Sequence, residues 1–379
     1  MSRNKVIDAL KGLAIILVVI GHAIPEAAAV SHGGRGLIEV FPQLWVPLRI
    51  ARDPSFEAVY SFQMPLFAFL SGFVLWRPKP PEPKTFVRKR VSGLVVPYFA
   101  WFGVFFLVAM LFGSPYPQGF VRSLMNVATH SPSQGGLWYL YALFVSSMLL
   151  LAIVRTGWSR WLLPVSALLA AAAQTLPAVS GTTLLGAVVV SLTYPYVALG
   201  YMVASKSELL PRVKGRLAIG GFLGFALVFS MIYPVDVPGT NLTSRLVAGL
   251  GGPMQLRIAF TQVLLYVGAV CAIAAVVGIY HFASGRFLST QAWLGRRTLG
   301  IYAMHGLASR VGVLAGVHNW IVLTAISLAV SLAATLVLER MGVLSQVFLG
   351  APAHESIRPP RPPRLHYDAP DNEKELSVG

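Results

Sequence analysis

The first apolar segment of the chain, residues 6–24, carries three ionisable side chains along one stripe of a predicted helix. Lys11 and His22 lie eleven residues apart, which on an α-helix is about 20° from three full turns and a rise of roughly 16 Å. Asp8, three residues before Lys11, lies close to the same line. Ionisable groups are costly in a segment of membrane-spanning length, so this stripe indicates a functional site.

One chemistry that this stripe could perform is acyl transfer. An imidazole titrates near neutral pH and can take the proton from a hydroxyl that attacks an acyl group. A lysine can hold phosphate groups as a point charge. The spacing of Lys11 and His22 therefore suits an acyl-coenzyme A, which is anionic at one end and reactive roughly 16 Å away. A second interpretation is that Lys11, paired with Asp8, reaches the membrane surface while His22 lies among the lipid headgroups.

The composition is that of a membrane protein. The chain has 379 residues, of which 55% are hydrophobic and only 12% charged, with a mean hydropathy of +0.67. Apolar runs of about 20 residues recur along it, each long enough to cross a bilayer. We therefore predict an all-α, polytopic integral membrane protein with about ten transmembrane helices. The expected spans are about 6–25, 56–76, 92–113, 137–154, 161–178, 182–204, 216–234, 258–281, 298–316 and 319–339.

The net charge of +16 follows membrane topology rather than nucleic acid binding. Lys and Arg gather in alternate connections, as they do in the cytoplasmic loops of membrane proteins. This pattern predicts a protein of the cytoplasmic membrane with both termini in the cytoplasm, membrane lipids as partners and no nucleic acid partner. The basic segment 77–90, which includes Arg88 and Arg90, lies on the predicted cytoplasmic side, where it could contact anionic lipids or donor phosphates.

The chain reads as one membrane domain with a short tail. Residues 1–345 form the predicted domain, and the Pro-rich segment 346–379 has nothing to bury and is predicted to be disordered. Cys271 is the only cysteine, which excludes a disulfide frame and a thiolate metal cluster, and no metal is expected. Gly220 and Gly224 form a pair at helical spacing that is typical of close helix packing.

Four segments, in the same order along the chain, resemble motifs of the membrane acyltransferase 3 family. Residues 8–22 are similar to its opening motif, in which Arg or Lys precedes a His by ten intervening residues. Residues 61–73 resemble its second-helix signature, 137–143 its Trp-aromatic-Leu segment and 299–305 its late Tyr-x-x-His segment. The Lys-Gly opening is closer to the branch grouped with fucose 4-O-acetylases, and ten helices is the usual count in the family.

The resemblance implies transfer of an acyl group, most often acetyl from cytoplasmic acetyl-coenzyme A, to a hydroxyl of a carbohydrate or another cell-envelope metabolite. His22 becomes the essential histidine, as general base or as carrier of the acyl group, and Lys11 its basic partner on the coenzyme A side. The expected catalytic residues are then His22 and Asp8, and the expected donor-binding residues are Lys11, Arg88 and Arg90.

Three residues of the segment 298–316 are candidates for substrate binding. Tyr302 lies one turn before His305, so both side chains can face one cavity. His305 could instead form a hydrogen bond with a neighbouring helix. Arg310 either binds an anionic part of a substrate or extends to the membrane surface.

Two further candidates, Ser71 and Trp138, have strong structural alternatives. Ser71 could be a nucleophile, but Ser-Gly is a common close-packing pair, and we favour packing. Trp138 could stack on a sugar, although aromatic residues at this depth more often belong to the belt at the membrane surface.

Two other classes of function compete with the enzyme. A secondary transporter or flippase of an envelope intermediate usually needs carboxylates within the membrane. By sequence, Asp8 is the only candidate acid in a span, with Glu57 and Glu339 at span ends, and this scarcity disfavours transport. A non-catalytic sensor or scaffold would tolerate substitution of His22.

Overall fold

The computed structural model describes residues 4–31, 54–111, 137–166, 168, 187–233, 242–249 and 254–350. Within these ranges every regular element is a helix. The all-α class is therefore confirmed.

Seven helices among the described residues are long and apolar enough to cross a membrane, so the class of polytopic membrane protein is also confirmed. The number is below the expected ten. Two predicted spans correspond to the shorter helices α8 (Ala187–Ala204) and α13 (Thr298–Leu314), and most of 161–178 lies outside the described residues. The long helices are α1 (Lys5–Ser31), α2 (Pro54–Leu75), the run of α3 (Pro83–Arg90), η1 (Val91–Val95) and α4 (Val96–Leu111), α6 (Trp138–Arg155), η5 (Ser207–Leu209) with α9 (Leu210–Ile232), α11 (Met254–Tyr280) and α14 (Trp320–Glu339).

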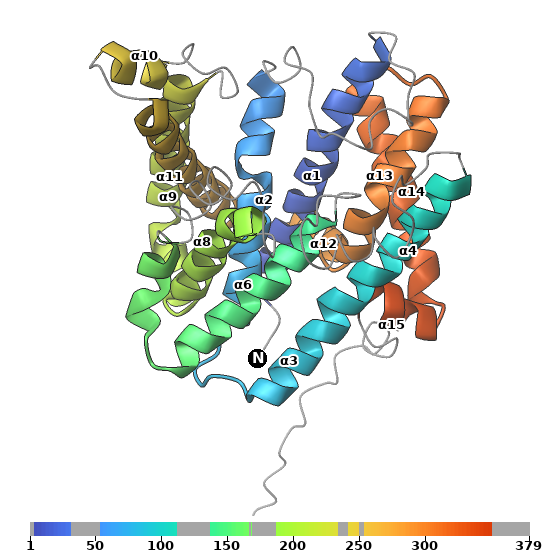
Figure 1. Ribbon diagram of the computed structural model, residues 1–379, viewed down its shortest axis with the longest axis horizontal. Coiled ribbons are helices and arrows are strands. Elements are labelled where there is room, and N and C mark those ends of the chain that lie inside the picture. The colour runs from blue at the N-terminus through green and yellow to red at the C-terminus, as the bar shows by residue number, and fades with distance from the viewer. Residues whose placement is uncertain are drawn as a thin grey trace, which may run out of the picture.

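Helix α1 lies in the middle of the bundle, where it packs against α2, α13, α14 and the short helix α12 (Gly285–Gly295) (Figure 1). Helices α9 and α11 form a pair on one side, joined at their upper end through α10 (Leu242–Gly249). Helix α15 (Val343–Leu349) lies toward the end of the bundle opposite α10. The described residues also include the short 3₁₀ helix η3 (Ser159–Trp161).

Glycines let other helices approach α1 on two sides. A Cβ added at Gly12 would collide with the backbone carbonyl of Gln291 on α12, and one at Gly21 would collide with the side-chain amide of Gln63 on α2. Gln63 is only 1% exposed, and its Oε1 has no hydrogen-bond partner among the described residues. These close contacts therefore require glycine at both positions of α1. Small residues of this kind are common where membrane helices cross closely.

In α9, one of the two glycines that pack against the neighbouring helix differs from the prediction. Gly221 and Gly224, rather than Gly220 and Gly224, face α11, where they meet Ala275 and Cys271. A Cβ at Gly220 would meet no atom within 4 Å. The expectation for Gly220 was therefore wrong, because spacing alone does not say which way a helix is rotated.

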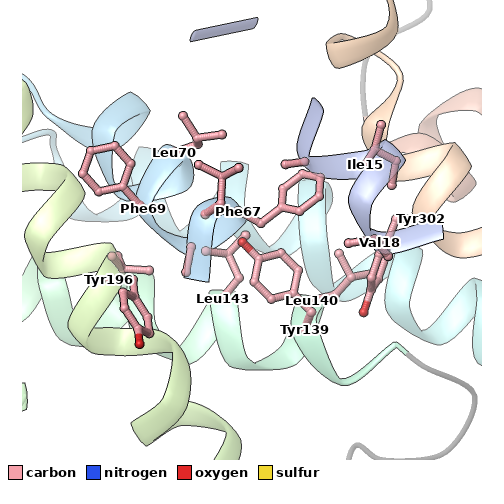
Figure 2. Close-up of a cluster of buried hydrophobic side chains, with 14 of the residues drawn as sticks. Ile15, Val18, Phe67, Phe69, Leu70, Tyr139, Leu140, Leu143, Tyr196 and Tyr302 are labelled. Atoms are coloured by element: carbon pink, nitrogen blue, oxygen red, sulfur yellow. The ribbon is translucent and has the colours of Figure 1, made fainter. Parts of the chain in front are cut away.

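The largest buried cluster lies where α1, α2, α6, α8 and α13 meet (Figure 2). Apolar side chains from these helices fill the space between them, and burial of such side chains is the main source of packing contacts in the interior. Two members of this cluster, Tyr139 and Tyr302, also belong to a row of aromatic rings that reaches His305. The labelled members are Ile15, Val18, Phe67, Phe69, Leu70, Tyr139, Leu140, Leu143, Tyr196 and Tyr302.

Two helix ends differ from expectation. α1 continues to Ser31 through Pro25, beyond the expected end near residue 25, and so includes Glu26. α15 continues past residue 345, where the domain was expected to end. Its Phe348 carbonyl accepts a hydrogen bond from Trp101 Nε1 of α4 at 3.0 Å, so α15 contacts the bundle, and the division of the chain near residue 345 stays a prediction. Residues 351–379 lie outside the described residues, and their disorder stays a prediction.

Candidate active site

His22 on α1 and His305 on α13 meet ring to ring. Their ring centroids are 4.8 Å apart, with 55° between the ring planes. His305 is buried, with 5% of its surface exposed, while His22 is half-buried. Two of the residues that the sequence indicated for catalysis and substrate binding, 283 positions apart in the chain, therefore lie in one place.

The backbone fixes the orientation of the His305 ring. Its Nδ1 lies 2.6 Å from the carbonyl oxygen of Tyr302. A carbonyl only accepts hydrogen bonds, so Nδ1 must donate, and the neutral ring then carries its lone pair on Nε2. The His305 carbonyl in turn accepts a hydrogen bond from Ser327 Oγ of α14 at 2.8 Å. The expectation of a histidine bonded to a neighbouring helix therefore applies to its backbone, while its ring contacts His22.

Aromatic rings continue from the histidine pair into the buried cluster. The Tyr302 ring lies 5.9 Å from the His305 ring and 5.9 Å from that of Tyr139 on α6 (Figure 2). The Tyr139 hydroxyl shares a hydrogen bond of 3.2 Å with Ser71 Oγ. Trp138 packs edge to face against Tyr139, and Tyr139 is the residue that reaches Tyr302.

A second polar contact joins α1 and α13 one turn further along. Ser309 Oγ donates a hydrogen bond to Glu26 Oε2. We missed Glu26 in the sequence because the first span was expected to end near residue 25. The signal was present nonetheless, since Glu26 follows His22 at the four-residue spacing of one helix face.

The other end of the stripe holds an ion pair. Lys11 Nζ lies 3.7 Å from Asp8 Oδ1, and the two side chains are 23% and 7% exposed. Along α1, Asp8 is fourteen residues from His22, a rise of about 21 Å. The position of Asp8 suits orientation of Lys11, and its expected catalytic role stays a prediction.

The two arginines expected to bind the donor lie on α3. Arg88 is exposed, and the Arg90 guanidinium lies 5.3 Å from the centre of the Phe86 ring. Glu82 caps this helix, because its carboxylate accepts hydrogen bonds from the Lys84 and Thr85 amides at 3.0 and 2.6 Å. Hydrogen bonds from Thr85, chiefly from its side chain and then from its amide, lower the pKa of Glu82. The two arginines thus lie on a capped helix at the end of the bundle opposite α10 (Figure 1).

The sequence profile of a family described as "Acyltransferase domain" matches residues 4–340. This chain belongs to that acyltransferase family. The acyltransferase is 26% identical over 379 residues to the nodulation protein NolL of Sinorhizobium fredii, covering 93% of each chain. It is 24% identical over 390 residues to the nodulation protein NolL of Mesorhizobium japonicum, covering 94% of this chain and 92% of the relative. No solved structure matches it.

The family and the helices together make the protein a membrane O-acyltransferase. The described part of the acyltransferase contains no group of three or more His, Cys, Asp or Glu side chains that could hold a metal ion. What its geometry brings together is a pair of imidazoles, a carboxylate bonded to a serine and, elsewhere on α1, a lysine–aspartate pair. An imidazole is a side chain that can remove a proton from a hydroxyl during acyl transfer.

Proposed function

We propose that this acyltransferase moves an acetyl group from acetyl-coenzyme A to a hydroxyl of a carbohydrate or another cell-envelope metabolite. The observation that carries the proposal is the contact between His22 and His305 at one end of a stripe whose other end holds Lys11. The proposed location is the cytoplasmic membrane, with both termini in the cytoplasm, because basic residues gather in alternate connections.

Lys11 is proposed to bind the phosphates of the donor. Its side chain is only 23% exposed and its ammonium group is paired with Asp8, so its position is restricted before the donor arrives. A preorganised cation loses less side-chain entropy on binding than a free one. The donor would then reach along α1 by roughly 16 Å to place its thioester beside His22. Arg88 and Arg90 are proposed to supply further positive charge.

His22 is proposed to be the general base. The acceptor oxygen bonds to the acyl carbon, its proton passes to a ring nitrogen of His22, and the carbon–sulfur bond breaks. The coenzyme A thiolate leaves and takes that proton, which returns His22 to the neutral form. His305, with Nδ1 held by Tyr302, presents a fixed ring against His22 and limits its rotation. The same contact would also position His22 to carry the acyl group itself, with its nitrogen attacking the thioester first.

The test is release of free coenzyme A from acetyl-coenzyme A by purified protein in lipid nanodiscs, with envelope extract as acceptor. His22→Ala should lower kcat by about 10²-fold or more, because a general base contributes on that order. Lys11→Ala should raise the KM for acetyl-coenzyme A and leave kcat nearly unchanged, since it removes binding shared by substrate and transition state.

Two matched controls lie away from the site. His281 bonds through Nδ1 to the Val277 carbonyl at 2.7 Å, and Lys214 lies over the Phe282 ring at 4.2 Å, both near the end of α11. His281→Ala and Lys214→Ala should therefore keep wild-type kinetics. Wild-type turnover in His22→Ala would overturn the mechanism. Failure of the wild-type protein to release coenzyme A with any extract would overturn the proposed donor.

A further inference from the structure

A small apolar pocket lies between α6 and the continuous run of η1 and α4. Its volume is about 110 Å³. The residues around it include Leu94, Val95, Tyr98 and Phe99 from η1 and α4, and Leu140 and Phe144 from α6. An apolar cavity of about 150 Å³ can hold a molecule the size of benzene, so this pocket suits a short stretch of hydrocarbon chain.

The wall of the pocket includes a turn of unusual geometry. Residues Val91–Val95 form a π-helical turn between α3 and α4, and such turns are frequent at functional sites. On one side of this turn, a Cβ added at Gly350 would lie 2.7 Å from the Cα of Gly93. The end of α15 therefore covers that side, and the pocket lies on the side that faces α6.

Positive charge lies next to the pocket, one turn nearer the start of α3. The last turn of α3 holds Arg88, Lys89 and Arg90. The Arg90 guanidinium lies 5.3 Å from the centre of the Phe86 ring, so it is directed toward the start of α3 and not into the pocket. Leu94 follows Arg90 by four residues, a rise of roughly 6 Å along the helix.

This arrangement matches the dimensions of a phospholipid. The headgroup region of a bilayer adds about 5–8 Å on each side of the hydrocarbon core. A phosphate at the level of Arg90 therefore places the beginning of the acyl chain near Leu94, at the pocket. Phe99, which is 39% exposed, lies at the rim, so the pocket is not sealed from its surroundings. Basic side chains near a membrane surface favour lipids with negatively charged headgroups.

The acetyl-coenzyme A donor is the other ligand with phosphates, but it suits the pocket less well. Its pantetheine arm carries amide groups, and burial of an amide is unfavourable unless it forms a hydrogen bond. A fatty acyl chain has no polar group to satisfy. The last turn of α3 also carries three cations, so a lipid phosphate at Arg90 leaves Arg88 and Lys89 to face other phosphates.

We propose that the pocket binds an acyl chain of an anionic phospholipid whose phosphate is held by Arg90. The chain lies between α6 and the run of η1 and α4, and the headgroup lies against the last turn of α3. This lipid site goes beyond acetyl transfer and does not depend on it.

The experiment labels the protein in phosphatidylcholine nanodiscs that contain a small share of a probe lipid with a diazirine in its acyl chain. One probe is phosphatidylglycerol, which is anionic, and the other is phosphatidylcholine, which has no net charge. Mass spectrometry measures the label on peptides that cover residues 91–99 and 138–144. Label on these peptides should be at least about fivefold higher with phosphatidylglycerol, since one basic residue at the surface has an effect of that size on an anionic lipid.

Separate variants test the headgroup and the chain. Arg90→Gln should lower the ratio of the two labels by about fivefold, whereas Arg90→Lys, which keeps the charge, should preserve it. Val95→Trp places an indole in the pocket and should reduce label on both peptides with either probe. Phe222→Trp and Arg216→Gln, at exposed positions of α9, are the matched controls and should leave the labels unchanged. If Val95→Trp does not fold, Phe99→Trp at the rim takes its place.

Three outcomes would overturn the proposal. Equal label from both probes in the wild-type protein would refute the preference for an anionic lipid. Label spread evenly over all the apolar helices, or unchanged in folded Val95→Trp, would refute binding in the pocket. Loss of label from the two peptides when excess acetyl-coenzyme A is added would assign the pocket to the donor. Each result is independent of coenzyme A release, which tests acetyl transfer separately.

Discussion

The contacts of Ser71 bear on which of its two possible roles applies. By sequence it was either a nucleophile or a packing residue. In the structure its hydroxyl is engaged with the Tyr139 hydroxyl, and the neighbouring Gly72 lies against the carbonyl of Val197 on α8. A serine nucleophile needs a base such as a histidine beside its hydroxyl. The histidine pair lies on α1 and α13, whereas the observed partner of the Ser71 hydroxyl is Tyr139.

Ser71→Ala should therefore keep acetyl transfer at a rate comparable to that of the wild type. It should lower the free energy of unfolding by about 0.5–1.5 kcal/mol, the usual net value of one hydrogen bond. Single-turnover transfer and thermal unfolding in nanodiscs measure the two effects. Ser205→Ala, at an exposed serine bonded to the Met202 carbonyl, is the control and should change neither. Abolished transfer in folded Ser71→Ala would reinstate the nucleophile.

The individual site residues divide into those a sequence can reveal and those it cannot. His22 and Lys11 could be recognised because both lie on one helix, where spacing fixes the angle between them. Tyr302 and His305 likewise share a turn. The contact between His22 and His305 joins residues 283 positions apart, and no local pattern encodes it. Tyr139 was missed beside Trp138 for the same reason, since only tertiary packing decides which ring points inward.

For a helix, the spacing of residues along the sequence does not determine how the helix is rotated about its own axis relative to its neighbours. Gly220 and Gly221 are neighbours on α9, yet only Gly221 lies against the backbone of α11, at Cys271 and Ala275. The helix class and approximate ends of α9 followed from its apolar run, whereas its contact face depends on α11. Glu26 was missed for a related reason, because α1 continues through Pro25 past the end of its apolar run.

This adjacent pair provides a matched test. Gly221→Ala should destabilise the protein, because its Cβ would overlap backbone atoms of α11 and the two helices would have to separate. Gly220→Ala should be neutral or stabilising by up to about 1 kcal/mol, since alanine is the better helix former. Thermal unfolding in nanodiscs compares the two. Equal stability of both variants would contradict the observed rotation of α9.

For the whole molecule, apolar length predicted the architecture, while the described residues contain seven helices of spanning length instead of the expected ten. α13 is short, with 17 residues, and a buried helix need not cross the whole bilayer. α13 has much of its surface buried against α1 and α14, and several of its residues face the site. Apolar content identifies such a helix, while its length depends on where the neighbouring helices require it to begin and end.

The two ends of the bundle should face opposite sides of the membrane. α3 and α10 lie at opposite ends (Figure 1). In a Cys271→Ser background, Arg245→Cys on α10 should react with an impermeant maleimide in intact cells, since that end is predicted to face outward. Lys84→Cys on α3 should react only after permeabilisation. Both positions are exposed, so access to the reagent depends on the side of the membrane. The reverse pattern would invert the proposed topology.

The close contacts of α1 with two glutamines limit how this helix can move. Gly12 and Gly21 are nine residues apart, which on a helix is two and a half turns, so Gln291 and Gln63 lie against opposite faces of α1. A rotation or slide of α1 alone would press its backbone against the Gln291 carbonyl or the Gln63 side-chain amide. We therefore expect the helix that carries both Lys11 and His22 to keep its position relative to α2 and α12 when other helices of the bundle move.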